Sequence, residues 1–572
     1  MRIKAVIFDL DDTLYDCSGL LVGAARRRAA KAMVDAGLPI SIGEAYKLQL
    51  TVAEKYGPSS LVFNEIAKMH GMDHTLVECA LKTYNSDEVS EIEPFPDVIP
   101  TLKQLRQEKY KLFLVTMGVH RRQEMKLETL GISSCFDDIV VNDQEVGLLL
   151  EDCFTGLLQK YNLLPSEVAV VGDRVGLELR VAKTMGMYAI QMLHGRFKVE
   201  APLRNSEKPD YKIKHIYQLS TILELINKGK LPDRLRILTI GGGTGLPIVL
   251  QGLKTYSNSL TAVVTVTDSG RSSGILRKQY GIPPPGDARN CLVALSETDE
   301  QQEDLYKLFQ YRFDRGSLEG MSLGNLLMTA LTDITGSFEQ AIKKASKILA
   351  IKGKVLPSTL QDTHICAELE DGTRLEGEFN IRQPGKAPIK EVLLKPDNAD
   401  ALPETLEEIK NADIIVLGPG SLYTSIITNI LVKGLREAIG SSSATKIYVC
   451  NIVTQPGQTD GYVASDHIKA VTRYLGEGVL DYVLVNDNLP RKDILEKYEE
   501  EDAFVVRVDP GVSSLSVKAV EADLVEDLDK ARVLWEKQDL LRHNPDKLAD
   551  AICRVYARLP IRSLAAETEK VS

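Results

Sequence analysis

Two short segments far apart in the chain place the tightest limits on its fold. Each is an apolar strand that runs directly into a polar or glycine-rich turn: KAVIFDLDDT at Lys4–Thr13 and RILTIGGGTG at Arg236–Gly245. Buried strands of this kind commonly open α/β domains. The chain has 572 residues, whereas single hydrophobic cores stop growing at about 250–300 residues. The sequence therefore predicts two α/β domains.

Apolar strands recur after both segments, and helical stretches separate them. We expect further strands at 111–118, 137–143, 167–174 and 188–192 in the first half, and at 260–270, 412–421, 446–457 and 481–488 in the second. Most run into Gly, Asp, Asn or Ser, as buried parallel strands do when functional loops follow their carboxyl ends. The predicted fold class is therefore α/β, with two Rossmann-like parallel-sheet domains.

The domain bounds follow from the helices and from local composition. A helical stretch at about 20–81 interrupts the first domain, so we expect a helical cap inserted at about residues 17–93. The segment INKGKLPDR combines glycine, proline and charge, which is typical of a linker. We therefore expect domains at 1–227 and 234–572, joined by a linker at 228–233.

Charge and cysteine usage narrow the range of partners. The net charge of −11 disfavours nucleic acids and anionic membranes, whose backbones and headgroups would be repelled. No run of about 18 uncharged apolar residues predicts a membrane span, and the charged N-terminus is unlike a signal peptide. The eight cysteines are scattered without a CxxC pair, as in a reducing compartment. We expect a cytoplasmic protein.

The first candidate site follows the first strand. Asp9 and Asp11 belong to a D-x-D-x-T turn, and Thr116 ends a later strand. Asp173 and Glu178 follow a third strand in VVGDRVGLE. Neighbouring carboxylates repel one another unless a cation lies between them. Mg²⁺ binds few carboxylates together with water and phosphate, so the set predicts a magnesium site.

These motifs resemble those of the haloacid dehalogenase-like hydrolases over roughly residues 1–227. The matching segments are FDLDDTLYD (Phe8–Asp16), VTMG (Val115–Gly118) and GDRVGLE (Gly172–Glu178). The resemblance implies a phosphatase that acts on a phosphomonoester. It also implies that the segment at 17–93 is the cap of that family.

The resemblance further implies a role for each residue. Asp9 would attack phosphorus and form an aspartyl-phosphate, and Asp11 would protonate the leaving oxygen and then activate water. Thr116 would hydrogen-bond the transferring phosphoryl group. Mg²⁺ would be held by Asp9, the backbone carbonyl of Asp11 and Asp173, with support from Glu178.

One departure from the family pattern concerns a lysine. The family places a lysine about two dozen residues before the fourth-motif aspartate, and here that stretch reads VGLLLEDCF, with Leu150 at or next to the position. Losing such a charge costs several kcal/mol of transition-state stabilisation. Lys126, Arg121 and Arg122 are candidates to replace it. Slow turnover by a degenerate phosphatase fold is the alternative.

The second candidate site is built from glycine turns. GGGTGLP at 241–247 lies between a strand and a helical run, and LGPGSLYTS at 417–425 repeats that arrangement. Glycine lets backbone N–H groups approach an anion, and a helix N-terminus adds positive potential. Two such turns on one sheet suit a diphosphate.

Two polar segments accompany these turns. DSGRSSG at 268–274 closes a strand with a carboxylate, an arginine and hydroxyls, and PPPGDARNC at 283–291 places Asp287 near a helix start. Helix capping explains Asp287 and Ser421 about as well as a ligand role does, so both interpretations stay open.

Longer matches in the second half resemble the gluconeogenesis factors, relatives of the 2-phospho-L-lactate transferases, over about residues 234–487. The best matches are IGGGTGLP, PPGDARNCLVALS, SLGNLLMTALTDITGSFEQAI, VLGPGSLYTSIITNILV and VCNIVTQPGQTDGYVASDH. The resemblance implies a nucleotide-diphosphate ligand of the UDP-sugar type, a homodimer formed through this domain, and a role in cell shape, cell-wall precursor supply and carbon metabolism.

The residues that the motifs and the resemblance together place around this ligand are Gly242, Gly243, Thr244, Gly245, Asp268, Ser269, Arg271, Asp287, Asn290, Asn325, Gly420 and Ser421. Asp466 is a weaker candidate, because an aspartate in a turn is more often a local backbone cap. For His467 a satisfied structural role is the commoner explanation.

A second departure affects the chemistry of this domain. Many relatives carry an acidic residue and a glycine where this chain has Ser269 and Arg271. The change predicts a pocket that suits anions better than metals and counts against a Mg²⁺-dependent transferase. The alternative function is a 2-phospho-L-lactate transferase-type enzyme that acts on a deazaflavin acceptor.

Overall fold

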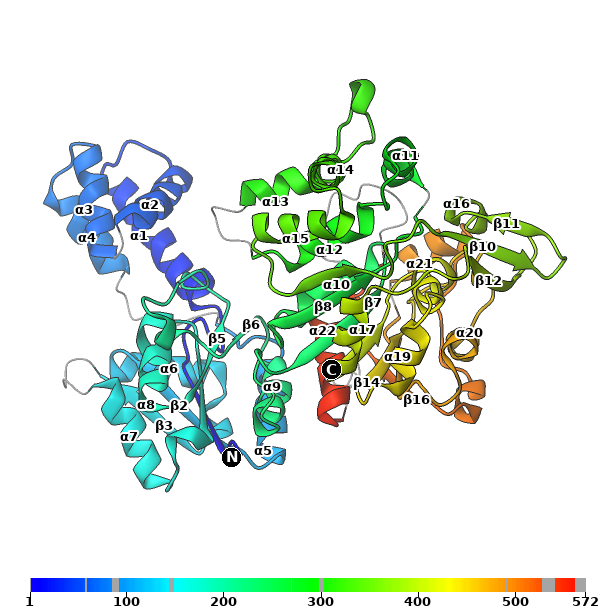
Figure 1. Cartoon of the computed structure of the whole chain (residues 1–572). Coiled ribbons are helices and arrows are strands. Elements are labelled where there is room, and N and C mark those ends of the chain that lie inside the picture. The colour runs from blue at the N-terminus through cyan, green and yellow to red at the C-terminus, as the bar shows by residue number, and fades with distance from the viewer. Residues whose placement is uncertain are drawn as a thin grey trace. The chain divides into compact units, whose positions relative to one another are not determined.

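The computed structural model describes residues 2–56, 59–84, 92–143, 149–268, 270–297, 303–489, 491–526 and 541–560. The chain divides into two compact units, Met1–Lys228 and Gly229–Ser572. Each unit is built around its own parallel sheet (Figure 1).

The first unit contains a six-stranded sheet with the order β3-β2-β1-β4-β5-β6. Every neighbouring pair is parallel. Its strands are β1 (Ala5–Phe8), β2 (Lys111–Met117), β3 (Asp138–Asn142), β4 (Val168–Gly172), β5 (Tyr188–Met192) and β6 (Tyr211–Ile213). All four residues of β1 are buried, as a central strand covered on both faces requires.

Helices follow the strands of this sheet and supply its core. They are α5 (Val98–Gln107), α6 (His120–Leu130), α7 (Leu150–Lys160), α8 (Arg180–Met185) and α9 (Gln218–Asn227). One core cluster joins Leu150, Phe154 and Leu157 of α7 to Ile7 and Val170 of the sheet. The position where the family places a lysine is therefore an apolar packing position here.

The cap predicted between the first two strands is helical. It contains η1 (Cys17–Val22), α1 (Gly23–Asp35), α2 (Ile42–Tyr56), α3 (Ser59–Met69) and α4 (His74–Tyr84). These helices have a core of their own, with Met33, Phe63, Ile66 and Leu76 buried together.

The second unit contains a seven-stranded sheet with the order β16-β15-β14-β13-β7-β8-β9. All neighbouring strands are again parallel. They are β7 (Arg236–Gly241), β8 (Ser259–Val264), β9 (Lys354–Pro357), β13 (Ile414–Leu417), β14 (Thr445–Val449), β15 (Tyr482–Asn486) and β16 (Lys518–Ala522).

Helices and a small antiparallel sheet complete the second unit. The elements that bear on the site are α10 (Gly245–Leu253), α11 (Arg271–Tyr280), α12 (Gly286–Leu295), α13 (Glu303–Gln310), α14 (Leu323–Thr335), η8 (Leu422–Ile427), α20 (Ala464–Leu475) and α22 (Pro545–Ala557). The small sheet comprises β10 (His364–Leu369), β11 (Arg374–Glu376) and β12 (Ile389–Lys395), and α16 (Glu378–Ile381) lies between β11 and β12.

In both parallel sheets the strand order reverses beside the first strand. The chain runs from β1 to β2 and β3 on one side and then crosses to β4, and β7, β8, β9 and β13 repeat that order. Ligands of doubly wound sheets bind beyond the carboxyl ends of the strands at such a switch point. The turns after β1 and β4, and those after β7 and β13, are therefore the places where sites are expected.

The predicted fold class, α/β with two parallel-sheet domains and a helical insert, is confirmed. The strand prediction missed β6, β9, β16 and the antiparallel sheet at 364–395. All eight cysteines are free thiols. Across the described residues, no helix combines the length and apolar character that crossing a membrane requires.

Candidate functional site

The turn after β1 holds the first pair of carboxylates. The Asp9 backbone N–H donates to the Val171 carbonyl at 2.9 Å, which joins the turn to the end of β4. Asp11 faces a different set of partners, since Tyr15 donates its hydroxyl proton to Asp11 Oδ1 at 2.6 Å. The two carboxylates that the sequence predicts for catalysis therefore sit in distinct surroundings.

Asp173 and Glu178 follow β4 beside this turn. Glu178 is buried, and its Oε1 accepts the Arg174 N–H at 2.7 Å. Burial and then repulsion by Glu178 raise the pKa of Asp173 to about 8. Burial and then repulsion by Asp9 raise the pKa of Glu178 to about 8, and burial with repulsion by Asp173 raises that of Asp9. Three carboxylates therefore face one another without full neutralisation.

Lys126 of α6 supplies a buried cation to the site. Its Nζ lies 2.8 Å from Asp11 Oδ1 and 2.7 Å from Asp11 Oδ2, and the residue is only 4% exposed. Of the three candidates for the missing lysine, it is the one that contacts a predicted catalytic residue; Arg121 is exposed and Arg122 half-buried. Lys126 therefore supplies a positive charge in place of the lysine that the family has near Leu150.

The residues around this turn suit Mg²⁺. Burial and then mutual repulsion raise the pKa values of Asp9, Asp173 and Glu178, and a divalent cation would relieve the repulsion. Among the described residues, the ligand atoms of these three carboxylates do not all lie within 4.8 Å of one another. Within the described ranges, the buried hydroxyl of Thr116 at the end of β2 has no hydrogen-bond partner. This hydroxyl is available to hydrogen-bond a ligand that binds together with the cation.

A second acidic cluster nearby was not predicted. One ligand atom from each of Asp12, Asp16 and His194 lies within 4.8 Å of the others. Asp12 already accepts the Ser18 N–H at 2.8 Å, and Asp16 accepts the Gly19 N–H at 2.6 Å. These carboxylates therefore accept hydrogen bonds from backbone N–H groups at the start of η1.

The raised pKa values predict how stability depends on pH. Between about pH 4 and pH 8 the folded chain retains protons on Asp173 and Glu178 that the unfolded chain has released. The free energy of unfolding therefore falls as pH rises through this window. We expect the Tm of the metal-free protein to fall by several degrees in the same range, and Mg²⁺ to reverse the fall at pH 8. A Tm that rises with pH in the absence of metal would contradict the acidic cluster.

In the second unit, the glycine turns after β7 and β13 touch. A Cβ on Gly245 would lie 2.5 Å from the Pro419 carbonyl oxygen, and one on Gly420 would lie 3.3 Å from the Gly242 carbonyl oxygen. Gly243 has a φ of +67°, which disfavours residues with a side chain. Glycine is therefore required for the two turns to meet.

Three carboxyl groups gather beside these turns. The Asp287 carboxylate accepts the Gly243 N–H, while burial and then repulsion by Asp268 raise its pKa to about 7. Pro285, not Asp287, is the N-cap of α12. Glu378 of α16 joins the pair by a hydrogen bond to Asp268, and burial and Asp268 raise its pKa to about 8. The prediction of a pocket that suits anions better than metals did not take Glu378 into account.

The other predicted residues take several positions. Asn325 donates to the Ser272 hydroxyl at 3.0 Å, and no described residue hydrogen-bonds its buried Oδ1. Ser421 is the N-cap of η8 but makes no side-chain cap bond. Ser269 and the side chain of Arg271 lie outside the described residues.

A cavity of about 490 Å³ adjoins the first glycine turn. Its walls come from α10, α12, α13 and the segments before and at the start of α22. The lining residues are Thr244, Pro247, Ile248, Gln251, Asn290, Val293, Ala294, Tyr306, Gln310, Glu526, Arg542, His543 and Pro545. The volume falls within the range of about 300–1,000 Å³ that is usual for small-molecule sites.

His543 gives this cavity a neutral polar group. Burial lowers the pKa of His543 to about 4, so the imidazole is neutral near pH 7. Among the residues that the structure describes, no group hydrogen-bonds its buried Nε2. Arg542 and His543 were missed in the sequence because the motifs ended at about residue 487.

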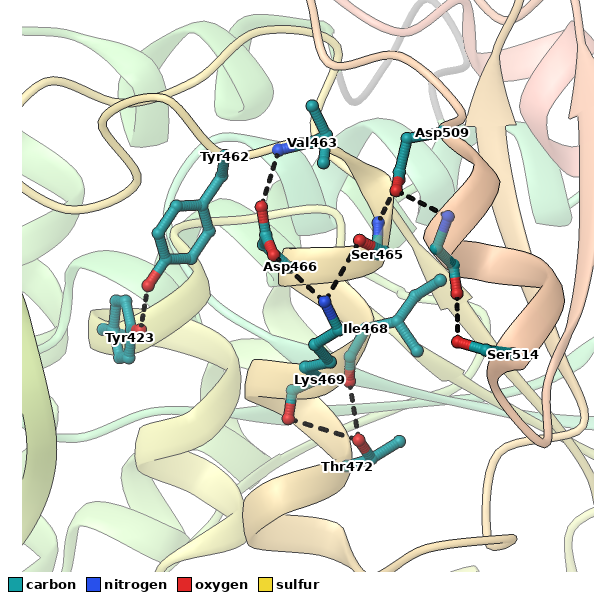
Figure 2. Close-up of polar contacts among 11 residues, drawn as sticks. Tyr423, Tyr462, Val463, Ser465, Asp466, Ile468, Lys469, Thr472, Asp509 and Ser514 are labelled. Atoms are coloured by element: carbon teal, nitrogen blue, oxygen red, sulfur yellow. Dashed lines mark hydrogen bonds and ion pairs between the residues drawn. The ribbon is translucent and has the colours of Figure 1, made fainter.

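Asp466 and its neighbours make local backbone contacts. Asp466 Oδ2 accepts the Val463 N–H at 3.3 Å, and Asp509 Oδ1 accepts the Ser465 N–H at 2.9 Å (Figure 2). Asp466 therefore caps the start of α20, which agrees with the prediction that it is a local backbone cap.

His467 lies in a buried aromatic group. Its Nδ1 lies 3.2 Å from the Tyr448 hydroxyl, and burial lowers its pKa to about 4. The Tyr462 ring packs edge-on against the His467 ring. The hydroxyls of Tyr423 and Tyr462 lie 2.7 Å apart (Figure 2). The packing agrees with a structural role, but the histidine is not fully satisfied, because its buried Nε2 has no hydrogen-bond partner among the described residues.

Comparison with protein families assigns both units. The family model described as 2-phospho-L-lactate transferase CofD matches residues 237–525, slightly more than half of the chain. The chain belongs to this family. A second model, haloacid dehalogenase-like hydrolase, matches residues 3–186. Both resemblances seen in the sequence are thereby confirmed.

Two relatives named gluconeogenesis factors match this chain along nearly their whole length. A gluconeogenesis factor of Halalkalibacterium halodurans is 47% identical over 317 residues, covering 55% of this chain and 95% of the relative. That of Bacillus subtilis is 44% identical over 318 residues, covering 55% and 96%. A crystal structure of a UPF0052 family protein from Bacillus halodurans has 47% identity and a TM-score of 0.52, covering 56% of this chain and 99% of that one.

Proposed function

We propose that the second unit is a gluconeogenesis factor that binds a UDP-sugar, and that the first unit is a Mg²⁺-dependent phosphatase. The observation that carries the first part is the contact between the glycine turns after β7 and β13, beside the cavity lined by Thr244. Backbone N–H groups at such turns and at the start of α10 provide donors and positive potential for a pyrophosphate.

The cavity suits the remainder of such a ligand. Thr244 and Asn290 connect it to the turn and to α12, while Arg542, Gln251 and Gln310 provide polar groups on its walls. Arginine pairs well with phosphate or with the carbonyl groups of a base. The neutral His543 can donate or accept a hydrogen bond without adding charge.

In the first unit, the residues fit phosphate-ester hydrolysis through an aspartyl-phosphate. A carboxylate oxygen of Asp9 bonds to phosphorus as the bond to the leaving oxygen breaks, and Asp11 donates a proton to that oxygen. Asp11 then takes a proton from the water that releases phosphate from Asp9. Mg²⁺, held by Asp9, the Asp11 carbonyl and Asp173, would neutralise charge on the phosphoryl group.

The physiological role that we propose rests on the relatives. Proteins that match the second unit are named gluconeogenesis factors, and we infer a regulatory role in carbon metabolism, cell-wall precursor supply and cell shape. The carboxyl groups of Asp268, Asp287 and Glu378 support the second candidate, a phospholactate transferase with a deazaflavin acceptor, because they could hold a metal for it.

Thermal shift tests the UDP-sugar proposal. We expect UDP-N-acetylglucosamine at saturation to raise the Tm of the intact chain by several degrees, because it binds the folded state alone. Arg542→Met should reduce the shift strongly, whereas Arg436→Met, an exposed arginine of the same unit, should not. A shift with GDP and none with UDP-sugars would favour the transferase instead.

A further inference from the structure

A pair of arginines lies beside the phosphatase site around one aromatic ring. Arg174 follows Asp173 directly, and Arg196 and Phe197 belong to the loop after β5. The guanidinium carbons of Arg174 and Arg196 lie 4.8 Å and 4.7 Å from the centre of the Phe197 ring. The two cations are therefore separated by no more than the sum of these distances.

The loop that carries Arg196 is fixed to the edge of the site. Glu200 Oε2 accepts the Gly176 N–H at 3.1 Å, which ties the loop to the turn after β4. A Cβ on Gly195 would lie 2.3 Å from Asp12 Cγ, so this part of the loop packs directly on the catalytic turn. Arg196 and Phe197 consequently stand at the carboxyl ends of the strands, where the substrate must enter.

Among the described residues neither arginine forms an ion pair, although the charge of Arg174 favours the ionised forms of the neighbouring Asp173 and Glu178. Within the described part of the chain, the buried Arg174 Nε has no hydrogen-bond partner. Two close cations repel unless an anion joins them. Guanidinium groups bind carboxylates and phosphates through paired hydrogen bonds.

We propose that Arg174 and Arg196 form a subsite for a second anionic group on the phosphomonoester that this unit hydrolyses. The proposal rests on the phosphatase function proposed above and narrows its substrate class. The Phe197 ring contacts both guanidinium groups and holds them beside a single side chain at the edge of the site. The second group is a carboxylate or a second phosphate, since both offer the oxygen pair that an arginine binds.

Matched substrates test the subsite in the intact, Mg²⁺-loaded chain. We expect kcat/KM to be at least about 10-fold higher for 3-phosphoglycerate than for glycerol 3-phosphate, or for fructose 1,6-bisphosphate than for fructose 1-phosphate. The first pair reports a carboxylate and the second a phosphate. Arg196→Gln and Arg174→Gln should remove the preference, whereas Lys198→Gln, an exposed cation on the same loop, should keep it.

Two results would overturn the proposal: no preference within either pair, or a preference that Arg196→Gln leaves intact. Arg196 is exposed, so its variant should fold even if that of Arg174 does not. Calorimetric binding of the same compounds to Asp9→Asn separates this proposal from the phosphatase assignment. Selective binding without turnover in the native protein would contradict only the phosphatase function.

Discussion

Asp9→Asn is expected to abolish phosphatase activity and, at the same time, to stabilise the protein. The variant removes the nucleophile, so kcat for p-nitrophenyl phosphate should fall by at least about 10⁴-fold. It also removes one of three carboxylates that raise one another's pKa. The Tm of the metal-free variant at pH 8 should therefore exceed that of the native chain.

A matched control separates the two effects. Asp35→Asn removes an exposed aspartate from the end of α1, so it should change neither kcat nor Tm. Retained turnover in Asp9→Asn would exclude the aspartyl-phosphate route. A lower Tm in Asp9→Asn would mean that favourable contacts of Asp9 outweigh its repulsion by Asp173 and Glu178.

Lys126→Met is expected to lower kcat for the same substrate by about 10²- to 10³-fold. The buried ammonium lies within hydrogen-bond distance of both Asp11 oxygens and carries the positive charge that Leu150 cannot supply. Lys126→Arg should retain part of the activity because it keeps the charge. The readout is kcat at fixed Mg²⁺, together with the Tm as a check on folding.

Two further variants test whether kcat depends on the positive charge of Lys126 itself or on where in the site that charge lies. Lys103→Met removes an exposed lysine of α5 and should leave kcat unchanged. Adding Leu150→Lys to Lys126→Met returns a lysine to the start of α7, where the family has one, and should recover part of kcat. Native turnover in Lys126→Met would show that this lysine serves only to neutralise Asp11 in the fold.

The sequence sufficed for those parts of both sites that directly follow buried strands. Asp9, Thr116 and Asp173 could be placed together because the carboxyl ends of parallel strands meet at one edge of a sheet. The turns at Gly242 and Gly420 could be paired for the same reason. The position of these residues in each site follows from the local sequence pattern and the sheet topology alone, and side-chain packing need not be known.

The remaining site residues come from elements whose position no local pattern reveals. Lys126 lies within a helix and reaches Asp11 only because that face of α6 turns inward. Glu378 belongs to a short helix in the antiparallel insert, far along the chain from Asp268. His543 lies just before α22. Tertiary packing, not propensity, brings each of them to its site.

A calorimetric titration of the intact chain with UDP-N-acetylglucosamine, UDP and uridine tests the central claim most directly. If the glycine turns after β7 and β13 hold a pyrophosphate, UDP should retain much of the affinity of the nucleotide sugar. Uridine should bind at least about 100-fold more weakly, because it lacks the charged groups that these turns receive. Equal affinities for uridine and UDP, or no binding of any of the three, would contradict the account.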